Sequence, residues 1–164
     1  MKTICIILFL TSTIVLSVEA QEKPGAQLNA GFGLSSWGIP IYAGADFGVA
    51  PDVTVGFEGS FRSYDQNYNG VNASTIIGIA GNGNYHFNRL LKIPPKFDFY
   101  AGMNLGFYFW STPRNYPGSG TSGIGLGAQV GGRYFFTRNF GLNLEFGGGN
   151  AFAGGKFGIT YRFK

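Results

Sequence analysis

The sequence predicts an all-β fold, an eight-stranded antiparallel up-and-down transmembrane β-barrel. After residue 20, apolar residues recur at every second position and no helical period appears, which is the pattern of strands. Eight such segments can be written, most of them about 9–13 residues long, which suits a tilted strand that crosses a bilayer. Charged residues make up only 12% of the chain, against about 25% in a soluble domain.

The first 20 residues, 1–20, are predicted to be a secretory signal peptide. Lys2 gives a positive start, residues 4–16 are mostly apolar, and Val18 and Ala20 place small residues before a cleavage site. The apolar run is too short for a membrane-spanning helix. The only cysteine, Cys5, lies in this leader, so the mature chain, residues 21–164, is expected to be one barrel domain without disulfides.

The first half of the chain contains four alternating segments: LNAGFGLSS (28–36), IYAGADFGVA (41–50), VTVGFEGSFRS (53–63) and TIIGIAGNGNYHF (75–87). The first alternates Leu, Ala and Phe with Asn and Gly. The second and third are joined by the short turn APD. The fourth follows residues 64–74, a polar and turn-rich stretch that is predicted to be a loop. Each segment is therefore predicted to be a strand with one apolar and one polar face.

The second half contains four more: FDFYAGMNLGFYFW (97–110), IGLGAQVGGRYFF (124–136), GLNLEFGGG (141–149) and KFGITYRF (156–163). The fifth segment has the strictest alternation in the chain. It is followed by a second long polar loop, residues 112–123, and the sixth and seventh segments are joined by the short turn TRN. Short turns are expected at one rim of a membrane barrel and longer loops at the other, although NRLLKIPPK (88–96) is long for a turn.

The two faces of these segments differ in polarity. One face is apolar along every segment and carries no charge. The other is rich in glycine and holds four acids and four bases, namely Asp46, Glu58, Asp98, Glu145, Arg62, Arg133, Lys156 and Arg162. Two architectures fit this pattern: a soluble lipocalin-like barrel with its apolar face inside, and a membrane barrel with its apolar face toward lipid.

The membrane barrel is favoured for three reasons. A water-facing surface would normally carry Lys, Glu and Thr rather than Gly. An eight-stranded barrel is just wide enough for side chains, and inward glycines leave room there for Arg and Tyr. Aromatic residues also gather at one end of their strands, as in an interfacial girdle: Tyr85, Phe87, Phe97, Tyr134, Phe136, Tyr161 and Phe163. Closure in hydrocarbon then requires the last segment to pair with the first.

The lumen charges are the main candidate site. Arg133 is expected to lie near Glu145, and Arg162 is expected to approach Glu145 from the next strand. Asp46 and Glu58, on a neighbouring hairpin, are expected to need cationic or hydrogen-bonding partners. A satisfied structural plug is favoured over a gated pore, because unpaired buried charge is costly and eight strands leave little open cross-section.

Other chemistry finds little support in the sequence. The only histidine, His86, is predicted to face the lumen near the short-turn rim, which argues against catalysis at the lipid surface. GIGLGA (123–128) lacks the helix that a dinucleotide site requires. No catalytic residue, cofactor or metal site is predicted. The basic residues are scattered and the net charge is only +4, so nucleic acid is not an expected partner.

Several stretches resemble the small outer-membrane β-barrel family that includes the OmpA and OmpX types. GITYRFK resembles the C-terminal strand signal of Gram-negative outer-membrane proteins, with alternating aromatics and a terminal Phe, here Phe163 followed by Lys164. GNYHFN and LNLEFGGG are also similar to this family. The resemblance implies that residues 21–164 lie in the cell outer membrane, inserted by the outer-membrane assembly machinery, which recognises the terminal strand.

The leading functional prediction is a non-enzymatic integral outer-membrane protein with a side-chain-filled polar lumen. It would be surrounded by outer-membrane lipid and would be a monomer. Alternatives are a narrow small-solute channel or transporter, an outer-membrane lipid-modifying enzyme, and a soluble secreted ligand-binding barrel. The two long loops are available for contacts; their aromatic and basic residues are Tyr64, Tyr68, Arg114 and Tyr116.

Overall fold

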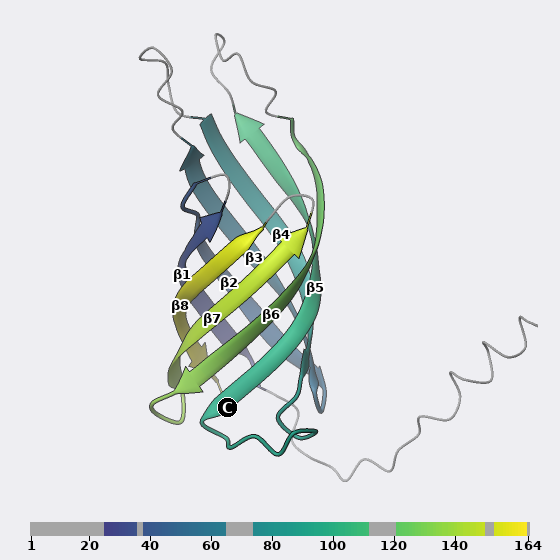
Figure 1. Ribbon diagram of the computed structural model, residues 1–164, viewed down its shortest axis with the longest axis vertical. Coiled ribbons are helices and arrows are strands. Elements are labelled where there is room, and N and C mark those ends of the chain that lie inside the picture. The colour runs from purple at the N-terminus through teal and green to yellow at the C-terminus, as the bar shows by residue number, and fades with distance from the viewer. Residues whose placement is uncertain (1–24, 36–37, 65–73, 112–120, 150–152, 164) are drawn as a thin grey trace, which may run out of the picture.

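The computed structural model describes residues 25–35, 38–64, 74–111, 121–149 and 153–163. They form a closed barrel of eight antiparallel strands, each hydrogen-bonded to its neighbours in the chain (Figure 1). In this part of the chain, no helix is long and apolar enough to cross a membrane. The expected signal peptide (1–20) and most of the two long loops lie outside the described residues, including Tyr68, Arg114 and Tyr116.

Every strand lies within two residues of its predicted bounds. The strands are β1 (Gln27–Ser35), β2 (Ile41–Ala50), β3 (Val53–Tyr64), β4 (Ser74–His86), β5 (Phe97–Ser111), β6 (Gly123–Phe135), β7 (Phe140–Gly149) and β8 (Gly154–Arg162). The predicted fold class is confirmed, because these eight strands pair in chain order into one closed antiparallel barrel.

The barrel closes between β8 and β1, as the sequence predicts. The register runs from Gln27 opposite Arg162 to Ser35 opposite Gly154. Beyond the strand ends, the backbone N–H of Phe163 donates to the carbonyl of Ala26 at 2.7 Å. Closure leaves no open sheet edge, so the backbone groups of all eight strands find partners inside the sheet.

The two faces of the sheet have the predicted orientation. Leu105 and Val130 project outward and are 59% and 57% exposed, whereas Asp98 and Arg133 project into the lumen and are 4% and 3% exposed. The barrel is therefore apolar outside and charged inside, the reverse of a soluble lipocalin-like barrel, whose apolar face points inward. The orientation of the side chains therefore excludes the soluble lipocalin-like barrel.

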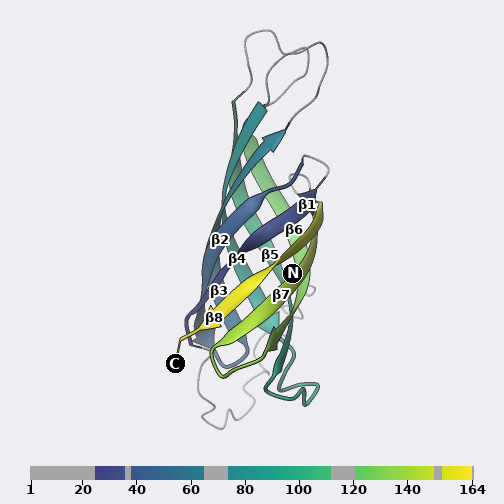
Figure 2. The ribbon, with the colours of Figure 1, turned by 90° about the vertical axis from the view of Figure 1, so that its left-hand side faces the viewer.

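One rim of the barrel carries the turns β2–β3, β4–β5 and β6–β7, together with the start of β1 and the end of β8 (Figures 1 and 2). All seven predicted girdle residues lie near this rim, and most are exposed. Their rings contact one another in pairs: Tyr85 with Phe87, Phe97 with Tyr134, Tyr134 with Phe136, and Tyr161 with Phe163. The exposed rings form a band at this rim. Such bands of aromatic residues are typical of the membrane–water interface.

Inward-facing glycines make room for large polar rings. A Cβ atom at Gly131 would overlap the ring of Tyr100, which lies directly opposite it on β5. A Cβ at Gly78 would come within 2.8 Å of Tyr108, and one at Gly158 within 2.7 Å of the hydroxyl of Tyr42. The glycine-rich face is therefore a volume requirement of a narrow lumen that holds tyrosine and arginine.

Candidate functional site

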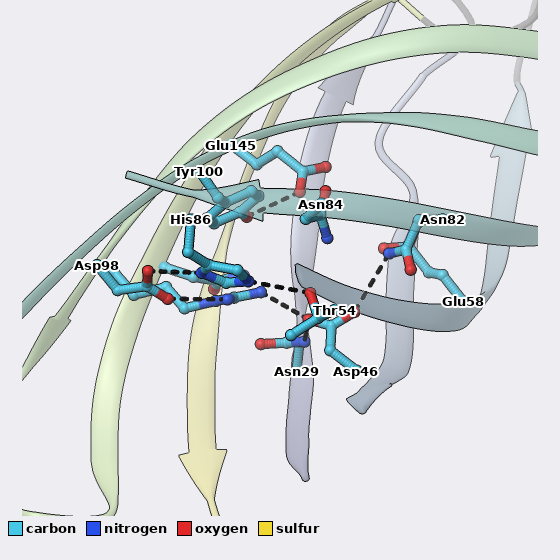
Figure 3. A network of polar contacts seen from close by, with 12 residues as sticks. Asn29, Asp46, Thr54, Glu58, Asn82, Asn84, His86, Asp98, Tyr100 and Glu145 are labelled. Carbon is cyan, nitrogen blue, oxygen red and sulfur yellow. Dashed lines mark hydrogen bonds and ion pairs between the residues drawn. The ribbon is translucent and has the colours of Figure 1, made fainter. Parts of the chain in front are cut away.

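The candidate site is a network of polar side chains that crosses the barrel lumen (Figure 3). Because alternate residues of every strand point inward, each of the eight strands contributes to it. The contributions, from β1 to β8, are Asn29, Asp46, Thr54 with Glu58, Asn82 with His86, Asp98 with Tyr100, Arg133, Glu145 and Lys156.

The first half of the network, the Arg133 cluster, consists of Arg133, Asp46, Asp98, His86 and Thr54. The guanidinium of Arg133 bridges two carboxylates: one nitrogen lies 2.6 Å from Asp46 and the other 3.1 Å from Asp98. All three side chains are almost completely buried. Such a fork suits Arg, whose planar guanidinium presents several donors in fixed directions.

Both carboxylates of the Arg133 cluster have further partners. Asp46 accepts hydrogen bonds from the side-chain amides of Asn29 and Asn82, at 2.9 and 3.3 Å. Asp98 contacts Nδ1 of His86 at 2.7 Å, and Nε2 of the same ring lies 3.0 Å from the hydroxyl of Thr54. Figure 3 shows this chain running from Asp98 through His86 to Thr54. The negative charges are thus held by several groups, as buried carboxylates require.

The second half, the Lys156 cluster, consists of Lys156, Glu58 and Glu145. The ammonium of Lys156 lies 2.8 and 2.9 Å from the two oxygens of Glu58, and 2.9 Å from Glu145. Glu145 and Lys156 are directly opposite each other in the β7–β8 register, whereas Glu58 reaches them from β3. Here, too, one cation bridges two acids across the lumen.

Tyr100 joins the two clusters. Its hydroxyl donates to Glu145 at 2.8 Å, and its ring lies under the guanidinium of Arg133, 4.3 Å from the centroid. The stacked geometry is favourable for a guanidinium over an aromatic face. The two clusters therefore form a continuous structure, and Tyr100 occupies the space between them.

The two remaining lumen cations contact other side chains. Arg62, near the long-loop end of β3, donates to the hydroxyl of Ser35 at 3.3 Å and lies over the ring of Tyr108. Arg162, near the opposite rim, stacks on Phe135 with its guanidinium carbon 3.9 Å from the ring centroid. All eight predicted lumen residues therefore point inward, at three levels along the barrel.

The ion pairs differ from the expected Arg133–Glu145–Arg162 cluster. Arg133 binds Asp46 and Asp98, Glu145 binds Lys156 and Tyr100, and Arg162 stacks on an aromatic ring. The reason is register: Arg133 faces Asn143 across the β6–β7 hairpin, and Glu145 faces Gly131. The expected partners of Asp46 and Glu58 prove to be Arg133 and Lys156, which come from distant strands.

Sequence reasoning did not assign network roles to Tyr100, Thr54 and Tyr42. Tyr42 bonds to Asn143 at 3.0 Å and lies beside the Lys156 ammonium. Their only signal is a place in the inward frame of a strand. A chain of amides adds to the packing: Asn104 donates to Gln129, and Gln129 donates to Asn84, both at 2.7 Å.

The lumen leaves little free space around the Lys156 cluster. A pocket of about 20 Å³ lies between Tyr42, Glu58, Arg62, Tyr108 and Lys156. This is room for about one water molecule. The side chains, rather than an open channel, fill the barrel here.

The order Thr54–His86–Asp98 has the connectivity of a hydroxyl nucleophile, its base and an orienting acid. Two features argue against that use. Thr54 is completely buried, so a substrate carbonyl has no approach to its hydroxyl. Asp98 is shared with Arg133, which ties the histidine into the ion-pair network. We interpret the three residues as part of the network.

In the described ranges, no group of three or more His, Cys, Asp or Glu side chains could hold a metal ion.

Comparisons with known proteins bear on the fold. No protein-family model matches the chain, and no curated protein matches it. Among solved structures, it is similar to the outer membrane protein OprG from Pseudomonas aeruginosa, with 12% identity and a TM-score of 0.58 over 86% of this chain and 97% of that one. Neisserial surface protein A gives 18% identity and a TM-score of 0.58 over 84% and 94% of the two chains.

A de novo designed transmembrane β-barrel is also similar, with 18% identity and a TM-score of 0.56 over 87% of this chain and 98% of the designed one. The chain therefore has the fold of small eight-stranded outer-membrane β-barrels, which confirms the predicted resemblance at the level of the fold. Because a designed barrel shares the fold, the fold alone does not specify a biological role.

Proposed function

We propose that this chain, an outer-membrane β-barrel by its fold, is a non-enzymatic integral membrane protein whose lumen is closed by the charged network. Its role would be structural, with the long loops of the rim opposite the aromatic girdle available for contacts at the cell surface. The observation that carries the proposal is the continuity of the network, to which all eight strands contribute side chains.

A closed lumen follows from the size and charge of these side chains. Arg133 and Tyr100 fill the centre of a barrel that is only wide enough for side chains. Moving either one out of the way would separate buried charges from their partners, which is costly in a dry interior. The network is thus expected to be a stable plug, and the outward apolar face is expected to be covered by lipid.

The test is conductance of the purified, refolded protein in planar bilayers. The wild type is expected to give no stable ion current. The double variant Tyr100→Ala/Arg133→Ser, which removes the central side chains, is expected to give small, steady currents. The matched control Phe99→Ala/Val130→Ser changes two outward residues on the same strands and is expected to stay closed. Steady wild-type currents would instead support a pore.

A narrow channel for small solutes is the second candidate. It is favoured by charged and amide side chains at successive levels of the lumen, from Arg62 through the two clusters to Arg162. A channel requires these pairs to separate without unfolding the barrel. In the same bilayers, a channel would show wild-type currents whose ion selectivity changes with Lys156→Gln.

Biogenesis is a further part of the proposal. We infer that residues 1–20 direct export and are removed, and that the assembly machinery of the outer membrane recognises β8. Phe163, just after β8, is exposed and packs its ring against Tyr161 at 4.9 Å. Phe163→Ser is expected to lower assembly in cells several-fold while purified protein still refolds into vesicles. Equal loss in both settings would point to a folding defect instead of lost recognition.

The barrel is expected to be a monomer. Because β1 and β8 pair over their full length, the sheet offers no edge to a second copy. Light scattering of the detergent-solubilised protein, corrected for bound detergent, is expected to give the mass of one chain. A folded barrel should also migrate differently on a gel before and after boiling, which checks that the sample is native.

A further inference from the structure

The outer surface of the barrel contains a marked depression among its outward-facing residues. An apolar groove of about 650 Å³ lies over β5, β6 and β7 and reaches β8 at Phe157. Its volume is within the range of about 300–1,000 Å³ that small-molecule sites occupy. The lining is almost wholly apolar, and its side walls are outward-facing rings and branched chains: Phe97, Phe99, Val130, Tyr134, Leu144 and Phe146.

The groove arises from one missing side chain. Three outward rows cross these strands, and the middle row reads Phe99, Gly132, Leu144. The rows on either side place Tyr134 and Val130 at the corresponding position of β6. Gly132 therefore leaves the backbone of β6 as a floor between taller walls. The ring of Phe99 leans toward the gap, so that a Cβ at Gly132 would lie 3.1 Å from it.

The groove extends to Phe97 and Tyr134, near the rim that carries the aromatic girdle, and two cations lie at that rim. Lys96 directly precedes Phe97, and its carbonyl accepts a hydrogen bond from the backbone N–H of Phe135. Arg138 lies in the β6–β7 turn, between the two strands that form the floor and one wall. Both are exposed. Residues 87–97 and 136–142, which include the β4–β5 and β6–β7 turns, contain no acid.

We propose that this groove binds one acyl chain of an anionic phospholipid, whose phosphate contacts Lys96 and Arg138. The proposal rests on the membrane location argued above. An apolar trough continuous with the lipid-facing surface suits an acyl chain, and exposed cations at the interface attract anionic headgroups. A zwitterionic lipid would gain the apolar contacts but little from the two cations.

The charge pattern of the same rim favours the binding of an anion near Lys96 and Arg138. Arg89 is another exposed cation of the β4–β5 turn, but it is ion-paired with Asp52. Asp98, the acid next to Phe97, points into the lumen, where Arg133 and His86 hold it. Neither the β4–β5 turn nor the β6–β7 turn therefore places an exposed carboxylate beside Lys96 or Arg138.

The test is native mass spectrometry of the folded protein released from vesicles of equal parts phosphatidylglycerol and phosphatidylcholine. The wild type is expected to retain one phosphatidylglycerol, with a preference of about thirtyfold over phosphatidylcholine, the effect of roughly two interfacial cations. Gly132→Leu places a side chain on the floor of the groove, where an acyl chain would lie, and is expected to abolish the retained lipid. Gly83→Leu is the matched control, because Gly83 faces a different part of the outer surface with nothing within 4 Å of its Cβ.

The cations are tested separately. Lys96→Gln and Arg138→Gln are each expected to lower the preference for phosphatidylglycerol several-fold while leaving total lipid retention little changed. Lys92→Gln, which removes an exposed charge from the middle of the same turn, is expected to have no such effect. These surface variants keep the proposal testable if Gly132→Leu does not fold, as judged by the gel shift on boiling.

Three other results would contradict the membrane function or the lipid site. If the protein does not insert into vesicles at all, the proposed membrane function fails. If it inserts and retains both lipids equally, or if Gly132→Leu and Gly83→Leu behave alike, the lipid site is overturned. If Gly132→Leu instead removes a cross-linked dimer, the groove is a contact between copies of the chain and the lipid proposal is likewise wrong.

Discussion

Arg133 and Asp46 form an ion pair of 2.6 Å although they come from strands on opposite sides of the barrel. Three strands separate β2 from β6 in either direction around the sheet. The pair therefore spans the lumen, and it ties together two walls that share no backbone hydrogen bonds. With Asp98 as its second partner, Arg133 connects the two halves of the barrel at its centre.

Arg133→Ala is expected to lower the free energy of unfolding by about 3–5 kcal/mol, because it leaves two buried carboxylates without their cation. Arg133→Lys keeps the charge but not the two-pronged geometry, so its loss is expected to be smaller. Urea unfolding of the refolded protein in lipid vesicles measures both. In the double variant Arg133→Ala/Asp46→Asn, the losses should be less than additive. Additive losses would show that the two residues do not interact.

Tyr100→Phe is expected to destabilise the barrel by about 1–3 kcal/mol, because the carboxylate of Glu145 loses a buried hydrogen-bond donor. The ring remains under Arg133, so the cation–π contact is kept. Tyr42→Phe is the matched control: it removes a hydrogen bond to a neutral amide, Asn143, and is expected to cost less. The same urea titration compares them, and a larger loss at Tyr42 would contradict the assigned role of Tyr100.

Leu105→Arg and Val130→Arg are each expected to cost about 2–4 kcal/mol if these side chains face the middle of the bilayer. Both project outward from the barrel, where an arginine would be placed in hydrocarbon. The rim substitution Thr137→Arg adds the same charge in the exposed β6–β7 turn and is expected to cost about 0–1 kcal/mol. Unchanged unfolding of Leu105→Arg in vesicles would mean that the outer face does not meet lipid.

The fold could be read from the sequence because its main signals are local. Alternation in a stretch such as 97–110 fixes both the strand and the face on which each residue lies. The charge-free face then decides which side is outward, since the charges share the other face. Gly131 and Tyr100 illustrate the same point, because an inward glycine beside an inward tyrosine follows from the frame alone.

The partners inside the lumen could not be predicted in the same way. Which inward residues meet across the barrel depends on strand tilt and on the stagger of all eight strands, which no single hairpin determines. Arg133 and Glu145 lie on paired strands, yet the β6–β7 register places Asn143 opposite Arg133. Lys156 was recognisable as an inward cation, but its contact with Glu58 appears only when the sheet is closed.

Gly131→Ala is expected to destabilise the barrel by about 1–3 kcal/mol through overpacking of the lumen. The added methyl group would overlap the ring of Tyr100, which cannot move aside without leaving Arg133 and Glu145. Gly83→Ala is the control, since that methyl group would point outward with nothing within 4 Å; its effect is expected to stay within about 0.5 kcal/mol. Urea unfolding in vesicles compares the two. Similar losses would mean that Gly131 is needed for its backbone rather than for the space it leaves to Tyr100.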